Sequence, residues 1–408
     1  MLALASWRSL AALLALACVF GAPYRLDAQA TTKAPGSFDF DADGIVFQTA
    51  DTSNRVIMRF RIQNHATTRS TSLDDLDIGS TEWMVRRLRL RFGGHLADRR
   101  LTFNLQLSFT RSDQDFSDTQ FPNIVRDAMV FWNFTPDLQI GFGQTKLPGN
   151  RQRVISSGDL QIGERSIVNN AFNLDRDFGF QGHWRVRVED VIVNLRGALS
   201  TGDGRNQSRI AGDGLAWTGR VEVLPFGAFL NGGDYFEGDL MREPTPKLSV
   251  GATIHDNQGH TRTRGQLGVR LFEPRSSSLL YLDAIAKWQG AAVYAEYARR
   301  TGADPITRSS DGRTAAVLVG SGWMAQASYI TPADVEVAAR VANVTPDDVL
   351  TGIADGVEQT DYSAAVTYYL RRHRVKAGLE VGQEHRRTLG TENVAKNWLL
   401  RANLEFGI

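Results

Sequence analysis

The stretch MVRRLRLRF, residues 84–92, alternates strictly between apolar and basic side chains from Leu88 onward. Successive side chains of a β-strand point to opposite faces, so this stretch predicts a strand with an apolar and a basic face. The two faces carry Leu88, Leu90 and Phe92 on one side and Arg87, Arg89 and Arg91 on the other. Neighbouring cations repel one another, so the basic face must meet bulk solvent, a nucleic acid or a water-filled channel.

The same alternation recurs over segments of about ten residues along most of the chain. LTFNLQLSF (101–109) sets leucine and phenylalanine against polar residues, and WLLRANLEFGI (398–408) ends the chain in the same way. Neither a fixed-period repeat nor a linker divides the chain. We expect about sixteen strands, at residues 55–65, 83–95, 100–110, 125–134, 138–146, 178–187, 190–200, 215–224, 247–255, 279–289, 291–299, 320–330, 333–342, 360–370, 373–384 and 397–408.

The connections between these segments are alternately short and long, with one exception at 225–246, which should be short and is long. This pattern predicts an all-β fold, a transmembrane antiparallel β-barrel. Every backbone group at membrane depth needs a partner, and only a closed sheet supplies one to each strand. A barrel of about sixteen strands is too wide to fill with side chains, so its inner face is polar and wet. Tryptophans near the strand ends suit the interfaces of a membrane.

A soluble all-β sandwich or solenoid is the alternative fold. Its polar face would look outward and would usually be rich in charges of both signs. Many polar faces here carry Gly, Ser, Thr, Asn, Gln and Arg instead. We therefore expect the membrane barrel.

The N-terminal segment predicts a secretory signal peptide, because an apolar run after Arg8 is followed by the small-residue site Ala28-Gln29-Ala30. A lipoprotein signal at Cys18 is the alternative. Cys18 is the only cysteine, so the exported chain would have no disulfide. The expected organisation is a signal peptide at 1–30, a short periplasmic lead-in at 31–54 and an outer-membrane barrel domain at 55–408.

Composition and motifs argue against other classes of function. Basic and acidic residues balance once residues 1–30 are removed, which argues against a nucleic-acid-binding protein. The histidines are scattered, and no HExxH, CxxC or convincing GxSxG motif is present. We therefore expect no enzyme, no catalytic residue, no metal site and no cofactor. His255, His260 and the Asp- and Gly-rich segment 202–217 resemble metal loops only weakly and suit solvated loops better.

Basic residues on the inner faces form the candidate site. Arginine stays charged and presents several N–H donors, so it can replace the hydration shell of an anion. Rows of arginine along a pore wall are a known selectivity device. The expected anion path on the wall consists of Arg59, Arg61, Arg87, Arg89, Arg91, Arg185, Arg220 and Arg401.

The long connection at about 147–177 predicts either a constriction folded into the pore or an external flap. Its basic residues alternate with Asp159, Glu164, Asp175 and Asp177. Carboxylates facing wall arginines would neutralise them and line an unselective pore, and the sequence leaves this alternative open against the anion path. The candidate basic residues of this loop are Lys146, Arg151, Arg153 and Arg165.

Several segments together resemble the phosphate-selective porin family, the O and P type, of bacterial outer membranes. The likeness covers nearly the whole chain after the signal peptide, and it rests on the order and spacing of the segments. They are RRLRLRFGG (86–94), QIGFGQTKLP (139–148), GERSIVNNAFNLDRDFGFQG (163–182), GRVEVLPFG (219–227), DAIAKWQGAAVYAEY (283–297) and GWMAQASYI (322–330).

The resemblance implies a sixteen-stranded barrel embedded in outer-membrane lipid, a homotrimer, periplasmic termini and a loop after the fifth strand that folds into the pore. It also implies that basic residues of the first two strands and of that loop line the phosphate path, which here match Arg59, Arg61, Arg87, Arg89, Arg91, Lys146, Arg151 and Arg153. The chain departs from the family in having few lysines and a balanced charge. The expected function is a passive channel for small anions, with phosphate as the first candidate. A general diffusion porin is the alternative, and a barrel-anchored adhesin or enzyme is a more distant one.

Overall fold

The computed structural model describes residues 36–41, 44–113, 123–207 and 214–408. Residues Ser37–Ile408 form one compact unit. The predicted signal peptide, residues 1–30, lies outside the described residues. No helix among the described residues is long and apolar enough to cross a membrane.

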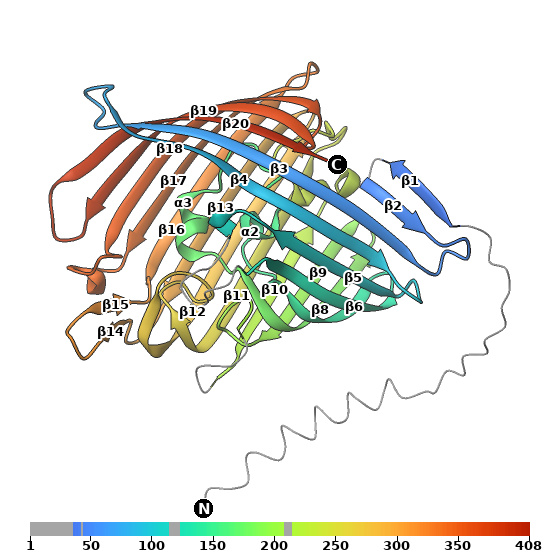
Figure 1. Cartoon of the computed structure of the whole chain (residues 1–408), viewed down its shortest axis with the longest axis horizontal. Helices are drawn as coiled ribbons and strands as arrows, with labels where there is room; N and C mark the ends of the chain where they lie inside the picture. The colour runs from blue at the N-terminus through green and yellow to red at the C-terminus, as the bar shows by residue number, and fades with distance from the viewer. Residues whose placement is uncertain (1–35, 42–43, 114–122, 208–213) are drawn as a thin grey trace, which may run out of the picture. The chain divides into compact units, whose positions relative to one another are not determined.

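Sixteen antiparallel strands form a closed barrel (Figure 1). Each strand pairs with the next along the chain, and the last strand pairs with the first from Gly407↔Arg61 to Leu399↔Arg69, which closes the sheet. The barrel strands are β3 (Arg55–Ser70), β4 (Ile78–His95), β5 (Leu101–Ser108), β6 (Val125–Thr135), β7 (Leu138–Lys146), β8 (Arg176–Val188), β9 (Val191–Ser200), β10 (Ala216–Leu224), β11 (Lys247–Arg262), β12 (Arg270–Trp288), β13 (Ala291–Thr301), β16 (Gly320–Ile330), β17 (Val335–Pro346), β18 (Val357–Arg371), β19 (Val375–Thr388) and β20 (Val394–Gly407).

The predicted strands are confirmed, since each expected range falls on one barrel strand. The main differences lie at the ends that face the long connections. There β3, β4, β11 and β12 continue for several residues beyond the predicted ranges. The alternation of apolar and polar residues weakens where a strand extends out of the apolar medium, because neither face of the strand has to be apolar there.

Side chains are arranged inside out compared with a soluble barrel. On β20 the apolar residues Leu400, Leu404 and Phe406 are about half exposed, whereas Arg401 and Glu405 on the opposite face are buried. β19 repeats the pattern, with exposed Leu379 and a buried, charged Glu380. This arrangement suits an apolar medium outside the barrel and a polar lumen within it.

Residues Ser37–Gln48 form a hairpin, whereas the sequence predicted only a polar lead-in. β1 (Ser37–Asp41) pairs with β2 (Gly44–Gln48), and β2 pairs with the start of β3 from Ile45↔Met58 to Gln48↔Arg55. β20 pairs with β3 only from Arg61 onward, so β2 extends the sheet past the end of β20 (Figure 1). The exposed rings of Phe38 and Phe47 pack edge to face on this hairpin.

The connection between β7 and β8 lies inside the barrel. It contains two short helices, α2 (Arg151–Val154) and α3 (Ile167–Phe172), and Ser166 caps α3 by accepting a hydrogen bond from the Asn169 N–H. Val168, Phe172 and Leu174 of this lumen loop, residues 147–175, belong to a buried apolar cluster with wall residues of β12, β13, β16 and β17. The loop therefore lies against one side of the lumen.

The connection between β10 and β11, residues 225–246, also enters the barrel, from the opposite end. It contains η3 (Leu230–Tyr235), and its Glu237 is fully buried and bonded to the lumen loop. The remaining short elements lie at the long-connection end: η2 (Arg111–Asp113), η4 (Asp348–Leu350) and the hairpin of β14 (Ile306–Arg308) and β15 (Thr314–Ala316).

Candidate functional site in the lumen

Two large cavities occupy the lumen beside β3 and β4, each with a volume of about 720 Å³. The outer cavity lies towards the long connections and is lined by Arg69, Glu164 and Arg386, among others. The inner cavity lies towards the short turns and is lined by Arg59, Arg372 and other residues. Basic side chains outnumber acidic ones in both linings. Arg89 lines both cavities and therefore stands where they meet.

A β-bulge on β4 turns two consecutive arginines into the lumen. The pairing with β3 shifts between Gln63↔Arg87 and Asn64↔Val85, which leaves Arg86 as the extra residue. Arg86 and Arg87 consequently both bond to the Glu164 carboxylate of the lumen loop, Arg87 through Nη2 at 2.8 Å. Strict alternation would have pointed Arg86 into the apolar medium.

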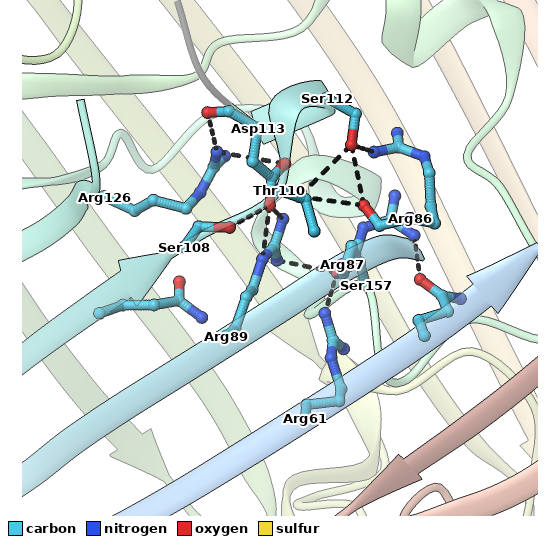
Figure 2. Close-up of polar contacts among 12 residues, drawn as sticks. Arg61, Arg86, Arg87, Arg89, Ser108, Thr110, Ser112, Asp113, Arg126 and Ser157 are labelled. Atoms are coloured by element: carbon cyan, nitrogen blue, oxygen red, sulfur yellow. Dashed lines mark hydrogen bonds and ion pairs between the residues drawn. The ribbon is translucent and has the colours of Figure 1, made fainter. Parts of the chain in front are cut away.

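The neck between the cavities is formed by two wall arginines and a serine of the lumen loop. Arg61 on β3 and Arg89 on β4 are cross-strand partners. Arg61 Nη2 donates to Ser157 Oγ at 2.5 Å, and Arg89 Nη1 donates to the same oxygen at 3.0 Å (Figure 2). The Ser157 hydroxyl therefore accepts two charged hydrogen bonds. These two contacts connect the barrel wall to the lumen loop between the two cavities.

Carboxylates at the neck are shared between arginines. Asp113 accepts from Arg89 at 2.6 Å and lies 3.3 Å from Arg126 of β6 (Figure 2). Glu164 is shared in the same way by Arg86 and Arg87. Each group of two guanidiniums and one carboxylate retains one positive charge.

The shared carboxylates stay ionised. Burial works to raise the pKa of the Glu164 carboxyl, but the Arg87 and Arg86 guanidiniums outweigh it and hold that pKa well below the usual range. Burial acts on Asp113 in the same direction, and Arg89 and Arg126 again outweigh it, so the pKa of Asp113 is also lowered.

The other predicted arginines of the first two strands also face the lumen. Arg59 and Arg91 are cross-strand partners and line the inner cavity. Arg91 Nε donates to Asn104 Oδ1 at 2.7 Å. Glu405 of β20, the strand that closes the barrel against β3, lies 3.4 Å from Arg61.

Four more predicted residues line the outer cavity: Arg401, Lys146, Arg153 and Arg165. Arg401 pairs with Glu380 at 2.7 Å and Arg153 with Asp175 at 2.6 Å. Lys146 and Arg165 donate instead to backbone carbonyls of the lumen loop, including that of Ile155. They therefore hold the loop in place.

Three predicted residues lie away from these cavities. Arg151 and Arg220 are buried together, and each pairs with both Asp283 and Glu222. This arrangement neutralises them and keeps them out of both cavity linings, so they anchor the loop to the wall. Arg185 is exposed towards the short-turn end and donates to Asn194. Tyr235 packs beside Arg151 and Arg196, and burial raises the pKa of its phenol to about 12.

Sequence reasoning missed several basic residues of the outer cavity. Arg86 was missed because a bulge leaves no trace in the alternation of apolar and polar residues. The others come from segments in which this alternation did not show which side chains face the lumen. These residues are Arg69, Arg86, Arg126, Arg176, Arg205, Arg264, Arg340 and Arg386. Arg126 and Arg176 begin strands with an Arg-Asp pair, a signal that in retrospect marks a lumen-facing ion pair such as Arg176–Asp127 at 2.9 Å.

The sequence profile of the phosphate-selective porins O and P matches residues 57–407 of the chain. A search of curated protein sequences found no significant match.

Solved structures with a similar fold include outer-membrane proteins, a porin and a channel among them. An anion-selective porin from Comamonas acidovorans is 13% identical with a TM-score of 0.55, and the match covers 86% of this chain and 99% of that one. The outer membrane channel DcaP of Acinetobacter baumannii is 12% identical with a TM-score of 0.53, over 86% and 97% of the chains. The trimer form of OmpT from Vibrio cholerae is 10% identical with a TM-score of 0.50, over 86% and 99%. At these identities the likeness concerns the fold.

Proposed function

The chain belongs to the family of phosphate-selective porins O and P, and from that premise we propose that it is a passive channel for small anions, with phosphate as the first candidate. As a porin it is an integral outer-membrane channel and not an enzyme. Diffusion down a gradient needs no covalent step.

The observation that carries the proposal is the sharing of carboxylates at the neck. Glu164 is divided between Arg86 and Arg87, and Asp113 between Arg89 and Arg126. The acids therefore orient the arginines without cancelling them. A positive excess in a narrow, partly desolvated passage attracts anions and repels cations.

The neck also has the geometry to prefer an oxyanion. Arg61 and Arg89 already converge on one oxygen, that of Ser157. A tetrahedral oxyanion presents several acceptors and can take a hydrogen bond from each guanidinium while it replaces the serine hydroxyl. Chloride lacks this directional set of acceptors, so phosphate should bind more tightly at the neck.

The alternative is a general diffusion porin without phosphate selectivity. The neutral cluster of Arg151, Arg220, Asp283 and Glu222 favours it, as does the Arg61–Glu405 contact. In that case the lumen arginines would mainly hold the loop in position.

Phosphate inhibition of the chloride current separates the two functions. Purified protein in a planar bilayer carries chloride while phosphate is added at constant ionic strength. A binding channel saturates, so the chloride current falls at low phosphate and levels off. An unselective pore shows only the small change expected from replacing one ion by another.

The finer placement of the chain is also proposed. Residues 1–30 are a cleaved signal peptide, residues 31–54 precede the barrel domain at 55–408, and both termini face the periplasm with the short turns. The half-exposed apolar residues of the outer face contact lipid. The long connections and the outer cavity then face the cell exterior.

We also propose a homotrimer. The trimer form of OmpT supports it through the shared fold. Among the described residues, the start of β4 pairs only with β3, and its Ile78 and Trp83 are 70% and 81% exposed, which suits contact with a second copy. Mild cross-linking in detergent should yield trimers, and Trp83→Ser should weaken them.

A further inference from the structure

The connection at 225–246 is an anomaly in both sequence and structure. Every other connection on its end of the barrel is short, whereas this one enters the lumen. The barrel does not need it for closure, because β10 and β11 pair directly from Val223↔Val250 to Ala216↔Asn257. Its length therefore calls for a role inside the channel.

The wall holds this inward turn, residues 225–246, through several polar contacts. Lys287 of β12 is buried and donates to the carbonyls of Gly233 at 2.6 Å, Phe236 at 2.9 Å and Gly238. The Gly290 N–H donates to Asp239 at 2.7 Å. These contacts fix the turn as a rigid part of the lumen.

The inward turn is also joined to the lumen loop. The buried Glu237 carboxylate accepts from Gln152 Nε2 at 3.0 Å and from the Gln161 N–H at 3.1 Å. Its own N–H donates to the Asp159 carbonyl at 3.0 Å. In addition, Arg151 donates to the Asp234 carbonyl at 2.9 Å. Two segments that enter from opposite ends of the barrel thus meet at Glu237.

The turn forms the wall of the inner cavity opposite the arginine strands. The cavity lies between Arg59, Arg61 and Arg91 on one side and residues of the turn on the other, namely Asn231, Gly233, Phe236, Gly238, Asp239, Leu240, Met241 and Glu243. The position of the turn therefore sets how far the open path extends from the arginines.

We propose that the inward turn is a second constriction element that, together with the lumen loop, confines solutes to one path along β3 and β4 and sets the size limit of the pore. This inference rests on the channel itself and not on its anion preference. Removing the turn widens the path at the short-turn end, while the arginines of the neck remain.

The test compares single-channel conductance and liposome swelling with sugars of increasing size. In one variant Asn-Gly replaces residues 226–247, a two-residue turn that suits an antiparallel hairpin. We expect conductance to rise several-fold and larger sugars to enter, with the sign of the reversal potential unchanged. Thr245→Ala, in an exposed part of the same turn, is the control. Unchanged conductance and size limit in a heat-modifiable, folded variant would overturn the proposal.

A second variant avoids changing the fold. Met241 lines the inner cavity, and Cys18, in the predicted signal peptide, is the only native cysteine. Labelling of Met241→Cys with a bulky methanethiosulfonate reagent should lower the conductance, whereas labelling of Thr245→Cys should not. Full labelling of Met241→Cys without loss of current would contradict the proposal. A cation-selective wild type would instead refute the anion channel and leave this inference intact.

Discussion

Arg89 joins three parts of the channel: it lines both cavities, pairs with Asp113 and shares the Ser157 hydroxyl with Arg61. Its side chain is one-tenth exposed, so its charge acts in a poorly solvated place. At the scale of single residues, the charge at this neck should decide which ions pass.

Replacing Arg89 by glutamine should weaken phosphate inhibition of the chloride current. A charged hydrogen bond contributes about 1.5–3 kcal/mol, so the inhibition constant should rise roughly tenfold or more. Arg185→Gln, at the exposed short-turn end, is the matched control and should have little effect. Equal effects of the two variants would show that the neck has no special role.

Glu164→Gln tests the same charge balance by removing a negative charge instead of a positive one. The variant keeps the shape of the side chain but removes the negative charge between Arg86 and Arg87. The preference for anions over cations should increase, as read from the reversal potential. A decrease would mean that Glu164 acts mainly by positioning the loop.

The sequence partly predicted which side of the sheet each side chain faces. Alternation placed Arg87, Arg89 and Arg91 in the lumen, where they line the cavities. Arg86 was not predictable, because a bulge depends on local pairing and leaves no periodic signal.

Among the elements, the lumen loop is held by two kinds of contact. Its α3 side packs into the apolar cluster around Phe172, and its α2 side inserts Arg151 between Asp283 and Glu222. The length of the loop left open a fold into the pore or an external flap, and the resemblance to the porin family implied the former. Neither predicted how the loop is attached. Alternation places Glu222 on the same face of β10 as Arg220, but it cannot tell that Asp283 of β12 and Arg151 of the lumen loop join them.

Replacing Arg151 by methionine should loosen the lumen loop. Arg151 has no exposed surface, and its loss leaves the Asp283 and Glu222 carboxylates buried with fewer partners. Breaking a buried ion pair from one side costs about 3–5 kcal/mol. We expect lower resistance to heat unfolding on gels and a noisier channel current.

Arg153→Met is the matched control for that variant. Arg153 lies on the same helix, but it lines the outer cavity and pairs there with Asp175. Its effect on heat unfolding should be smaller. A larger effect than that of Arg151→Met would show that the buried cluster is not the main anchor.

In the whole molecule, the sheet is closed, with apolar side chains outside and polar side chains inside. Both features follow from the alternation of apolar and polar residues in the sequence. Each barrel strand pairs with a neighbouring strand on both sides, and apolar side chains look outward. The two lumen insertions were harder to predict, because their contacts join residues far apart in the chain. Length alone marked both of them.

Acidification should make the lumen more positive. Burial raises the pKa of Asp159, which lines the inner cavity, so this carboxylate loses its charge early as the pH falls. The lowered pKa values of Glu164 and Asp113 keep those groups ionised below the usual carboxyl value of about 4. The contribution of Glu164 and Asp113 to loop docking is therefore present above the usual carboxyl value and is lost only as the pH falls through the lowered pKa.

Burial lowers the pKa of His373, so this imidazole stays neutral.

The measurement is the reversal potential at neutral pH and at a pH of about 5. Anion preference should increase on acidification, and Asp159→Asn should reduce the increase, because burial also raises the pKa of Glu243 in the inner cavity. A fall in anion preference between these pH values would contradict the assignment.

We propose that the lumen arginines keep enough charge to select anions. The decisive measurement is the reversal potential of the purified wild-type protein in a planar bilayer under a KCl gradient. We expect a potential close to that of chloride, reduced towards zero in Arg89→Gln. A potential close to that of potassium would show that the arginines do not select anions.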